Sequence, residues 1–217
     1  MTARRLTVLL LLPSCALAGS LWVLLATDTF TVRRVTVTGT RSLDPVAVAE
    51  AAGIAVGGRL VTLDTRASAG RVTLLPRVRS ATVVRRWPDT VRITIVERAP
   101  LAVTRESGQW LFVDEAGVTF PGAQSGAGLP VLSADGPAAR QAAAATIAAL
   151  PEWLAPEVSR VTAPSAHSVR LSLADGVTVI WGGADEADRK GAVLAVLRRL
   201  PARVYDVSTP QIATITR

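Results

Sequence analysis

The chain has 217 residues and a formal net charge of +7, and it contains one cysteine, one histidine and one tyrosine. A single cysteine excludes an intramolecular disulfide, and so little imidazole and thiolate argues against a zinc site or a Ser-His-Asp triad. The sequence shows no cluster of basic and aromatic residues of the kind that binds nucleic acids, so we expect no nucleic-acid partner. The many arginines and alanines are typical of a GC-rich genome.

An uncharged segment dominated by leucine, valine and alanine extends from Leu6 to Ala26. As a helix it would be about 30 Å long, which matches the hydrocarbon core of a bilayer. Arg4 and Arg5 precede it, so the positive-inside rule keeps the N-terminus in the cytoplasm and directs the rest of the chain outward. Outside the membrane, a basic surface favours anionic lipid headgroups or acidic wall polymers. We expect a single-pass helix of the cytoplasmic (inner) membrane with the anchor positions Leu6, Leu12, Trp22 and Ala26.

Two other interpretations of this segment stay open. Ala16-Leu17-Ala18 is similar to the cleavage site of a secretory signal peptide, although the apolar run continues after it to Ala26. Leu12-Pro13-Ser14-Cys15 resembles a lipoprotein signal only weakly, because proline fits that motif poorly. In a membrane helix, Cys15 is a small apolar residue and Pro13 is a tolerated kink.

The next region predicts a strand, two helices and two further strands, in that order. Asp44 followed by Pro45 is a helix N-cap with proline at the first helical position, and Asp64 is a second N-cap. Trp87-Pro88-Asp89 predicts a turn between the last two strands. Such a unit buries both helices against one face of a small sheet, which is an α+β arrangement. The spacing of apolar residues and the helix caps place the strands at 30–38, 78–86 and 90–97 and the helices at 45–52 and 65–75.

The remainder of the chain predicts a mixed β domain with an antiparallel sheet and flanking helices, so that the fold class is α+β throughout. Asp175-Gly176 is a strong hairpin signal. Strands are expected at 101–103, 110–113, 118–120, 169–173, 177–181, 204–207 and 211–215. Helices are expected at 138–150 and 185–200. In the second of these, the amphipathic pattern predicts a buried stripe of Val193, Leu194, Val196, Leu197 and Leu200.

Two groups of polar residues suggest catalysis, but each has a simpler structural interpretation. Asp114 and Glu115 form a carboxylate pair suited to acid-base chemistry. No histidine or lysine accompanies them, and a turn is the better interpretation. Ser165-x-His167 lacks the rest of a hydrolase site, so we expect His167 on the surface or at a strand edge.

Three further dipeptides also favour structural roles. Glu97-Arg98 is interpreted as a salt-bridged hinge between two domains rather than as a partner contact. Gly57-Gly58 and Gly182-Gly183 are turns, because neither has the lysine and hydroxyl residues of a phosphate loop. We therefore predict no catalytic, cofactor-binding or metal-binding residue, and no small-molecule substrate.

Motifs spread over the whole chain together resemble a known family. Residues Phe30-x-Val32-x-x-Val35-x-Val37-x-Gly39 open the exposed region, and Pro76-x-Val78-x-x-Ala81-x-Val83-x-Arg85-x-Trp87-Pro88 follows. Then come Ile93-x-Ile95-x-Glu97-Arg98-x-Pro100-x-Ala102, Val113-Asp114-x-x-Gly117 and, near the end, Asp206-Val207-Ser208. No single motif is specific, but their order and spacing and the predicted topology resemble the FtsQ/DivIB family of bacterial cell-division proteins.

The resemblance implies a cytoplasmic tail at 1–5, a transmembrane helix at 6–26, a POTRA domain at 30–98 and a β domain at 99–217. It implies a scaffold at the division septum, with no enzyme activity and no cofactor. Members of the family bind the small membrane proteins FtsB (DivIC) and FtsL, among other division proteins, and help to control septal peptidoglycan synthesis.

The resemblance also implies a binding site, because FtsB binds along the C-terminal strand of the β domain in this family. A terminal strand often lies at a sheet edge, where a partner segment can pair with the free backbone groups as an added strand. Pro210 lacks an N–H group, so continuous pairing is expected only after it. The candidate partner-binding residues are Tyr205, Asp206, Val207, Thr209, Gln211, Ile212, Thr214 and Ile215.

Each of these side chains has the alternative of an ordinary role in the core, and this applies above all to Tyr205, Ile212 and Ile215. Tyr205 is nevertheless a reasonable hot-spot candidate. Thr209 stands where some relatives have an anchoring aromatic residue, the cytoplasmic tail is very short, and no long tail follows the last strand. We expect the mode of contact to persist with different side chains.

A second hypothesis is a POTRA-containing component of an envelope assembly or transport complex. That class carries repeated POTRA units, whereas this sequence predicts one. A cell-wall enzyme is a third hypothesis, which the missing catalytic residues disfavour.

Overall fold

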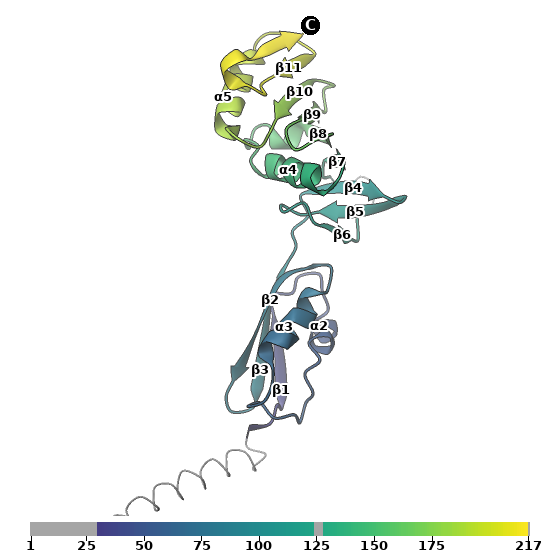
Figure 1. Cartoon of the computed structure of the whole chain (residues 1–217), viewed down its shortest axis with the longest axis vertical. Helices are drawn as coiled ribbons and strands as arrows, with labels where there is room; N and C mark the ends of the chain where they lie inside the picture. The colour runs from purple at the N-terminus through teal and green to yellow at the C-terminus, as the bar shows by residue number, and fades with distance from the viewer. Residues whose placement is uncertain (1–29, 124–127, 217) are drawn as a thin grey trace, which may run out of the picture. The chain divides into compact units, whose positions relative to one another are not determined.

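The computed structural model of the chain describes residues 30–123 and 128–216. The chain divides into two compact units, with the boundary between Glu97 and Arg98. Each unit has its own sheet and its own hydrophobic core (Figure 1). The predicted membrane helix, Leu6–Ala26, lies outside the described residues. Within the described ranges, no helix has the length and apolar character needed to cross a membrane.

The first unit has the predicted order of elements. They are β1 (Arg34–Thr38), α2 (Pro45–Ala51), α3 (Thr65–Thr73), β2 (Val78–Arg86) and β3 (Thr90–Glu97). The sheet order is β1-β3-β2, with β1 parallel and β2 antiparallel to the central strand. Both helices pack on one face of this sheet and share a single core with it (Figure 1).

Local side-chain bonds explain where the two helices begin and how they are joined. Asp44 and Asp64 each accept a backbone N–H from the first turn of the following helix, at 3.0 and 2.9 Å, as expected of N-caps. Arg71 of α3 donates to the Ala52 carbonyl oxygen at 2.6 Å. Because a helix C-terminus leaves its last carbonyls free, this bond ties the end of α2 to α3.

The central strand alternates between buried and exposed side chains, as the sequence predicted. Val91, Ile93 and Ile95 are at most 2% exposed and face the helices. Gly39, just after β1, has a φ of +90°, and a Cβ atom there would lie 2.0 Å from the Ile95 carbonyl oxygen. Only glycine allows the chain to pass this close to β3.

The carboxylate of Glu97, at the end of β3, holds the loop that precedes α2. It accepts backbone N–H groups of Arg41, Ser42 and Leu43 at 2.6 to 3.1 Å and the Ser42 hydroxyl at 2.6 Å. Burial alone would raise the pKa of this carboxyl. The hydrogen bonds from Ser42, Arg41 and Leu43 stabilise the ionised form more strongly and lower the pKa from 4.5 to about 2.

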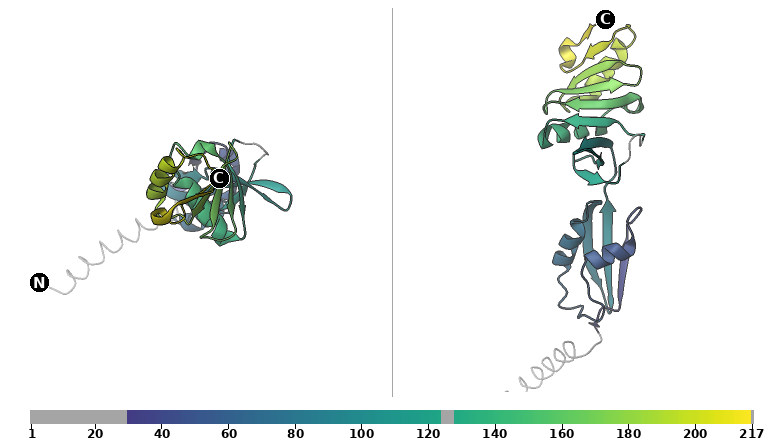
Figure 2. Two further views of the ribbon diagram at one scale, coloured as in Figure 1. Left: turned by 90° about the horizontal axis from the view of Figure 1, so that it is seen from above. Right: turned by 90° about the vertical axis from the view of Figure 1, so that its right-hand side faces the viewer.

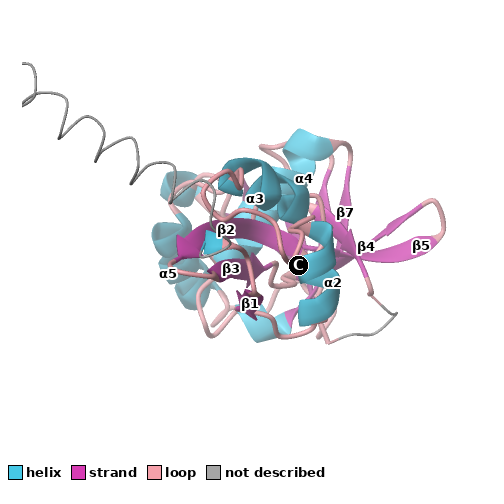
Figure 3. Cartoon of the chain, turned by 90° about the horizontal axis from the view of Figure 1, so that it is seen from below, coloured by secondary structure: helices cyan, strands magenta, loops and turns pink. Residues whose placement is uncertain are grey.

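The second unit is built on one long sheet in the order β12-β11-β10-β9-β8-β7-β4-β5-β6. Its first elements are β4 (Ala102–Glu106), β5 (Gln109–Val113), β6 (Thr119–Pro121), β7 (Val131–Ala134), α4 (Pro137–Ala148), η2 (Ala155–Glu157) and β8 (Val158–Ala163). They are followed by β9 (Val169–Leu173), β10 (Thr178–Gly182), α5 (Ala187–Leu197), β11 (Val204–Asp206), η3 (Pro210–Ile212) and β12 (Thr214–Thr216). The β4–β5 hairpin projects from the rest of this unit (Figure 3).

This sheet is mixed, so the prediction of an antiparallel sheet is only partly correct. The pairs β7–β8, β10–β11 and β4–β7 are parallel. Helix α4 joins the first pair and α5 the second, because parallel neighbours need a crossover connection. The sequence did not predict β7 or β8. β7 is short, and a register irregularity between Val158 and Arg160 interrupts the period of β8.

The core of the second unit lies between the sheet and both helices (Figure 2). Side chains of α4, α5 and the strands from β8 to β11 belong to one hydrophobic cluster, in which Trp181 is fully buried. Helix α5 is shorter than predicted. Leu194 is buried and Val193 and Leu197 are partly buried, as expected, but Val196 and Leu200 are 60% and 49% exposed. Their predicted burial is therefore wrong.

Asp114 shapes the turn between β5 and β6, which confirms the structural interpretation. Its Oδ1 accepts the N–H groups of Ala116 and Val118 at 3.0 and 2.8 Å, and its Oδ2 accepts the Arg98 guanidinium at 2.6 Å. The residue is 3% exposed, so this carboxylate is a buried structural group with its oxygens occupied. Glu97 and Arg98, adjacent in sequence, thus each bind within their own unit. His167 is exposed in the turn between β8 and β9, as predicted.

Candidate partner-binding site

The predicted binding segment lies at one edge of the large sheet. β12 pairs antiparallel with β11, with Tyr205 opposite Ile215 and Asp206 opposite Thr214. On its other side, β11 pairs in parallel with β10. The order of the sheet ends at β12 among the residues described, so the expected strand edge is present.

The backbone groups that face this edge follow from the bonds of β11. On one side of Tyr205, the Arg203 carbonyl oxygen accepts the Thr178 N–H at 2.9 Å. On the other side, the Val207 N–H donates to the Ile180 carbonyl oxygen at 2.9 Å, so both bonds connect β11 to β10. In a parallel ladder the N–H and C=O of Tyr205 then also point to β10, away from β12. Ile215, opposite Tyr205, therefore forms a non-hydrogen-bonded pair with it. We infer that the N–H and C=O of Ile215 point away from β11, toward the open edge.

Some of the predicted residues face the core instead of a partner. Tyr205 and Val207 are 3% and 0% exposed, and the Tyr205 hydroxyl donates to the Leu200 carbonyl oxygen at 2.7 Å. Ile215 is partly buried and packs against the same core. These side chains hold the edge strand in position. For Tyr205, the structure matches the alternative of an ordinary core residue.

Other predicted residues lie on the surface, but not all of them in a strand. Thr209, Gln211 and Thr214 are exposed, and Ile212 is 76% exposed. The predicted strand at 211–215 is wrong at its start, because Pro210–Ile212 is a 3-10 turn and β12 begins at Thr214. Pro210 has no N–H group to donate to a strand, and the Ile212 N–H bonds back to Thr209 at 2.9 Å.

Asp206 and its neighbours fix the segment between β11 and η3. Its carboxylate accepts the Ser208 N–H at 2.9 Å and the Ser208 hydroxyl at 2.7 Å, so it is bonded within its own turn. Gly182, at the end of β10, has a φ of +80°, and a Cβ there would lie 2.9 Å from the Ser208 Cβ. The turn after β11 therefore packs directly on a glycine backbone.

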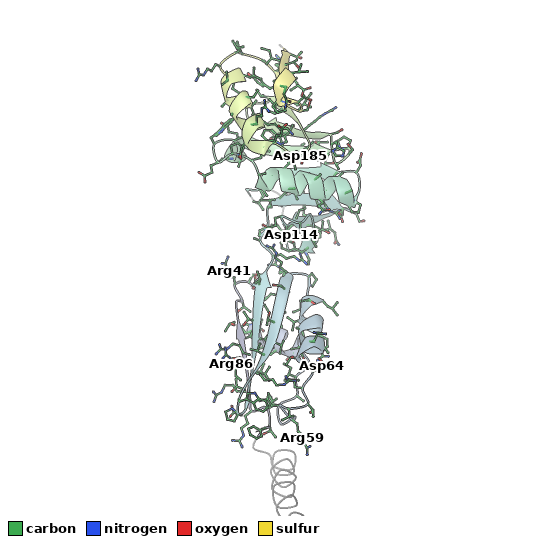
Figure 4. The ribbon with its side chains drawn as sticks, turned by 60° about the vertical axis from the view of Figure 1, so that its left-hand side comes forward. Arg41, Arg59, Asp64, Arg86, Asp114 and Asp185 are labelled. Atoms are coloured by element: carbon green, nitrogen blue, oxygen red, sulfur yellow. The ribbon has the colours of Figure 1, made fainter. Side chains whose placement is uncertain are left out.

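Lys190, the only lysine, is buried at the start of α5. Its Nζ donates to the Gly183 carbonyl oxygen at 2.9 Å and joins the helix to the corner at the end of β10. Burial lowers the pKa of this amine, while the negative charges of Asp185 and Glu186 oppose the shift. Figure 4 marks Asp185 in the second unit. Because Lys190 and Gly191 are buried together with Leu194, the buried stripe of α5 is displaced from the predicted one and leaves Val196 exposed.

The side chains that sequence reasoning missed are those of Val196 and Leu200. They lie on α5 and the turn after it, and α5 packs against η3, which carries Ile212. Three large apolar side chains are thus exposed on α5, on the turn after it and on η3, the turn that leads into β12. The spacing of Val196 and Leu200 in the sequence also fits a buried stripe of a helix. Only the packing of the folded chain therefore shows that these side chains are on the surface and not in the core.

A cavity of about 360 Å³ lies elsewhere in this unit, along β4, β5 and β7. Arg140 and Glu106 form an ion pair of 2.6 Å at its wall, and the Arg105 guanidinium lies 6.0 Å from the Trp110 ring centre. No predicted site residue lines it. Among the residues described, no group of histidine, cysteine or acidic side chains is arranged to hold a metal ion.

Comparisons with known families assign both units. The model of the "POTRA domain, FtsQ-type" matches residues 30–98, and that of "Cell division protein FtsQ/DivIB, C-terminal" matches residues 102–215. Among solved structures, the extracytoplasmic domain of DivIB from Geobacillus stearothermophilus is 20% identical, with a TM-score of 0.36, and covers 48% of this chain and 98% of that one. A likeness this low supports no further conclusion.

Three curated relatives are all named "Cell division protein FtsQ". That of Mycobacteroides abscessus is 36% identical, covering 97% of this chain and 68% of the relative. That of Mycolicibacterium smegmatis is 39% identical, covering 87% of this chain and 58% of the relative. That of Streptomyces bingchenggensis is 36% identical, covering 98% of this chain and 87% of the relative. The chain therefore belongs to the FtsQ/DivIB family of cell-division proteins.

Proposed function

We propose that this chain is a non-catalytic scaffold of the division machinery, held in the cytoplasmic membrane with both described units outside the cytoplasm. Its proposed partners are FtsB/DivIC-like and FtsL-like membrane proteins at the septum, through which it helps to control septal peptidoglycan synthesis. Family membership supports the role in division, and the names of the relatives state no catalytic activity.

The open edge at β12 is the observation that carries the binding proposal. A partner segment that pairs with Ile215 gains backbone hydrogen bonds at a strand that has no other neighbour among the described residues. Ile212 on η3, just before this strand, and Val196 and Leu200 on α5 and the turn after it are exposed and offer apolar contacts to the rest of the partner. Backbone pairing supplies a general affinity, and these side chains supply the choice of partner.

A binding measurement with the FtsB/DivIC-like protein of the same bacterium tests this site. Replacing Ile212 with glutamate (Ile212→Glu) puts a charge in place of an exposed apolar side chain beside the start of β12 and is expected to weaken binding by about 2 kcal/mol, or roughly thirtyfold. The matched control is Leu74→Glu in the first unit, where Leu74 is 81% exposed. Undiminished binding by a folded Ile212→Glu chain would show that the interface lies elsewhere.

Depletion of the protein in growing cells tests the role in division itself. We expect cells that elongate without septa and recover when the wild-type chain is restored. Normal septation at unchanged cell length would contradict the divisome proposal, whatever the outcome of the binding measurement.

The proposed anchor, Leu6–Ala26, has a separate test in the N-terminal sequence of the protein isolated from membranes. An uncleaved N-terminus in the membrane fraction is expected. A mature N-terminus near Gly19 would support the signal-peptide alternative and remove the anchor from the proposal.

A further inference from the structure

The two units differ in charge. Residues 30–97 contain eleven arginines and five acidic residues, a formal charge of +6, whereas residues 98–216 contain ten basic and eleven acidic residues, a formal charge of −1. Two of the arginines in the first unit, Arg71 and Arg85, donate to backbone carbonyls of the 52–63 segment. The excess positive charge therefore belongs to other, exposed arginines.

Four exposed arginines gather at one end of the first unit, where the described chain begins. The Arg33 N–H donates to the Asp89 carbonyl oxygen at 2.8 Å, so the β2–β3 turn lies against the entering strand. On the other side, Thr31 forms a β-bridge with Arg59. We call this end the entry pole and define it by Phe30, Arg33, Arg34, Arg59, Arg86 and Trp87.

The entry pole combines free cations with an exposed aromatic side chain. Trp87 is 56% exposed and packs edge-to-face on Phe30, with ring centres 5.3 Å apart. Within the described ranges, the guanidinium groups of the four pole arginines have no ion-pair partner. The carboxylates near this end, Asp64 and Asp89, each accept a local hydrogen bond, at 2.9 and 2.8 Å.

Strand direction separates this pole from the far end of the same unit. Arg34 and Arg86 both pair with Thr90 at the start of β3, whereas Arg41 bonds through its backbone to Glu97 at the end of β3. An eight-residue strand is about 24 Å long. Figure 4 shows Arg41 and Arg59 at opposite ends of the unit. The far end therefore provides matched positions for control variants.

Chain length limits how far the entry pole can lie from a membrane. Only four residue steps separate Ala26, the end of the apolar segment, from Phe30. A fully extended chain spans about 3.5 Å per residue, so Phe30, where the pole begins, lies within about 14 Å of that end. This step rests on the proposed anchor, Leu6–Ala26. The guanidinium groups at the pole are then within reach of lipid headgroups.

We propose that the entry pole binds the surface of a bilayer that contains anionic phospholipid. Guanidinium groups form bidentate hydrogen bonds with phosphate, and the indole ring of Trp87 favours the boundary between headgroups and acyl chains. Each arginine near an anionic surface raises the binding equilibrium about fivefold. The bound pole fixes the orientation of the first unit on the membrane.

Quenching measured on the full chain in lipid nanodiscs tests this proposal. Cys15→Ser removes the native thiol, and Val61→Cys places a fluorophore in the loop that carries Arg59. Val61 is 40% exposed, and a second probe at Val46, which is 61% exposed, reports on the far end. A nitroxide on the lipid headgroup quenches a probe that lies at the bilayer surface. Nanodiscs of phosphatidylcholine alone are compared with nanodiscs that also contain phosphatidylglycerol.

We expect phosphatidylglycerol to increase quenching of the Val61 probe but not of the Val46 probe, and high salt to reverse the increase. Arg59→Glu with Arg86→Glu is expected to lower the ratio of bound to free pole at least 25-fold. The control pair Arg41→Glu and Arg79→Glu makes the same change of charge at the far end, where Val78 beside Arg79 pairs with Glu97, and should retain the increase.

Three results would overturn the proposal, and they differ from a failure of the anchor. Quenching that is the same in both lipid compositions contradicts anionic lipid binding, as does equal loss in both pairs of variants. Release of the pole by soluble polyphosphate at substoichiometric amounts would assign the surface to a phosphate polymer instead. A chain that fails to insert into nanodiscs of either composition contradicts the anchor, and the lipid proposal falls with it.

Discussion

The two units of this chain use their charged side chains in different ways. In the second unit, Arg98 pairs with Asp114, Arg140 with Glu106, and Arg198 with both Glu157 and Asp175. In the first unit, Arg71 and Arg85 bind backbone carbonyls, and the arginines of the entry pole face solvent. We therefore propose that recognition by the second unit relies on a strand edge and apolar side chains, and that recognition by the first unit relies on charge.

The largest stability effect is expected at the buried ion pair of the second unit. Asp114→Ala removes the carboxylate that holds Arg98 and two backbone N–H groups, and we expect a loss of about 3–5 kcal/mol in urea unfolding. Arg189→Ala is the control, because Arg189 and Glu186 are 57% and 47% exposed. That change is expected to cost less than about 0.5 kcal/mol. Similar costs for both variants would contradict the buried role of Asp114.

A backbone effect of slightly smaller size is expected in the first unit. Gly39→Ala introduces a Cβ 2.0 Å from the Ile95 carbonyl oxygen at a φ of +90°. We expect a loss of about 2–4 kcal/mol, visible as faster hydrogen exchange in β1 and β3. Gly70→Ala, in helix α3 with open space around it, should instead stabilise the unit by about 0.5–1 kcal/mol. Tolerance of alanine at Gly39 would disprove the close contact.

A change at the strand edge separates backbone binding from side-chain binding. Ile215→Pro removes the N–H group that we assign to the open edge, and Ile215→Ala removes the side chain but keeps that N–H. Relative to the alanine variant, proline is expected to weaken binding of the FtsB/DivIC-like partner by about 1–1.5 kcal/mol, or roughly tenfold. Equal affinities, measured by titration calorimetry, would show that the partner does not bond to this group.

An effect of similar size depends on pH and concerns Glu97. Because its folded pKa of about 2 lies below the ordinary 4.5, the ionised carboxylate stabilises the first unit above pH 4.5, and this contribution is lost as the pH falls from 4.5 to 2. Glu97→Gln should cost about 1–2 kcal/mol at pH 7 after allowance for solvent screening. The cost should shrink toward zero near pH 2. A pH-independent difference in unfolding free energy would contradict the hydrogen-bond origin of the shift.

The first unit could be predicted almost completely from sequence, because its signals are local. Asp44 and Asp64 mark the helix starts, and the alternation of Val91, Ile93 and Ile95 marks the central strand. Each of these patterns acts within a few residues, so tertiary contacts did not change the secondary structure that the local sequence predicts. Their agreement across the unit is typical of a sequence with one consistent fold.

The second unit was harder to predict, because the features that were predicted wrongly depend on contacts between residues far apart in sequence. Parallel pairing of β10 with β11 follows from the crossover through α5, and the amphipathic pattern of α5 does not show it. The same pattern placed Val196 and Leu200 inside, whereas the buried stripe of α5 includes Lys190 and Leu194 and the helix ends before Leu200. For the candidate site, the sequence identified the strand edge, but it could not separate buried Tyr205 from exposed Ile212.

The central claim, that a partner strand pairs with the open edge of the large sheet, has a direct test in amide hydrogen exchange. In the free chain, the Ile215 amide is expected to exchange rapidly, while the Thr214 amide is protected by β11. On addition of the FtsB/DivIC-like partner, the Ile215 amide should become protected. Protection of Ile215 in the free chain, or rapid exchange in the saturated complex, would contradict strand addition at β12.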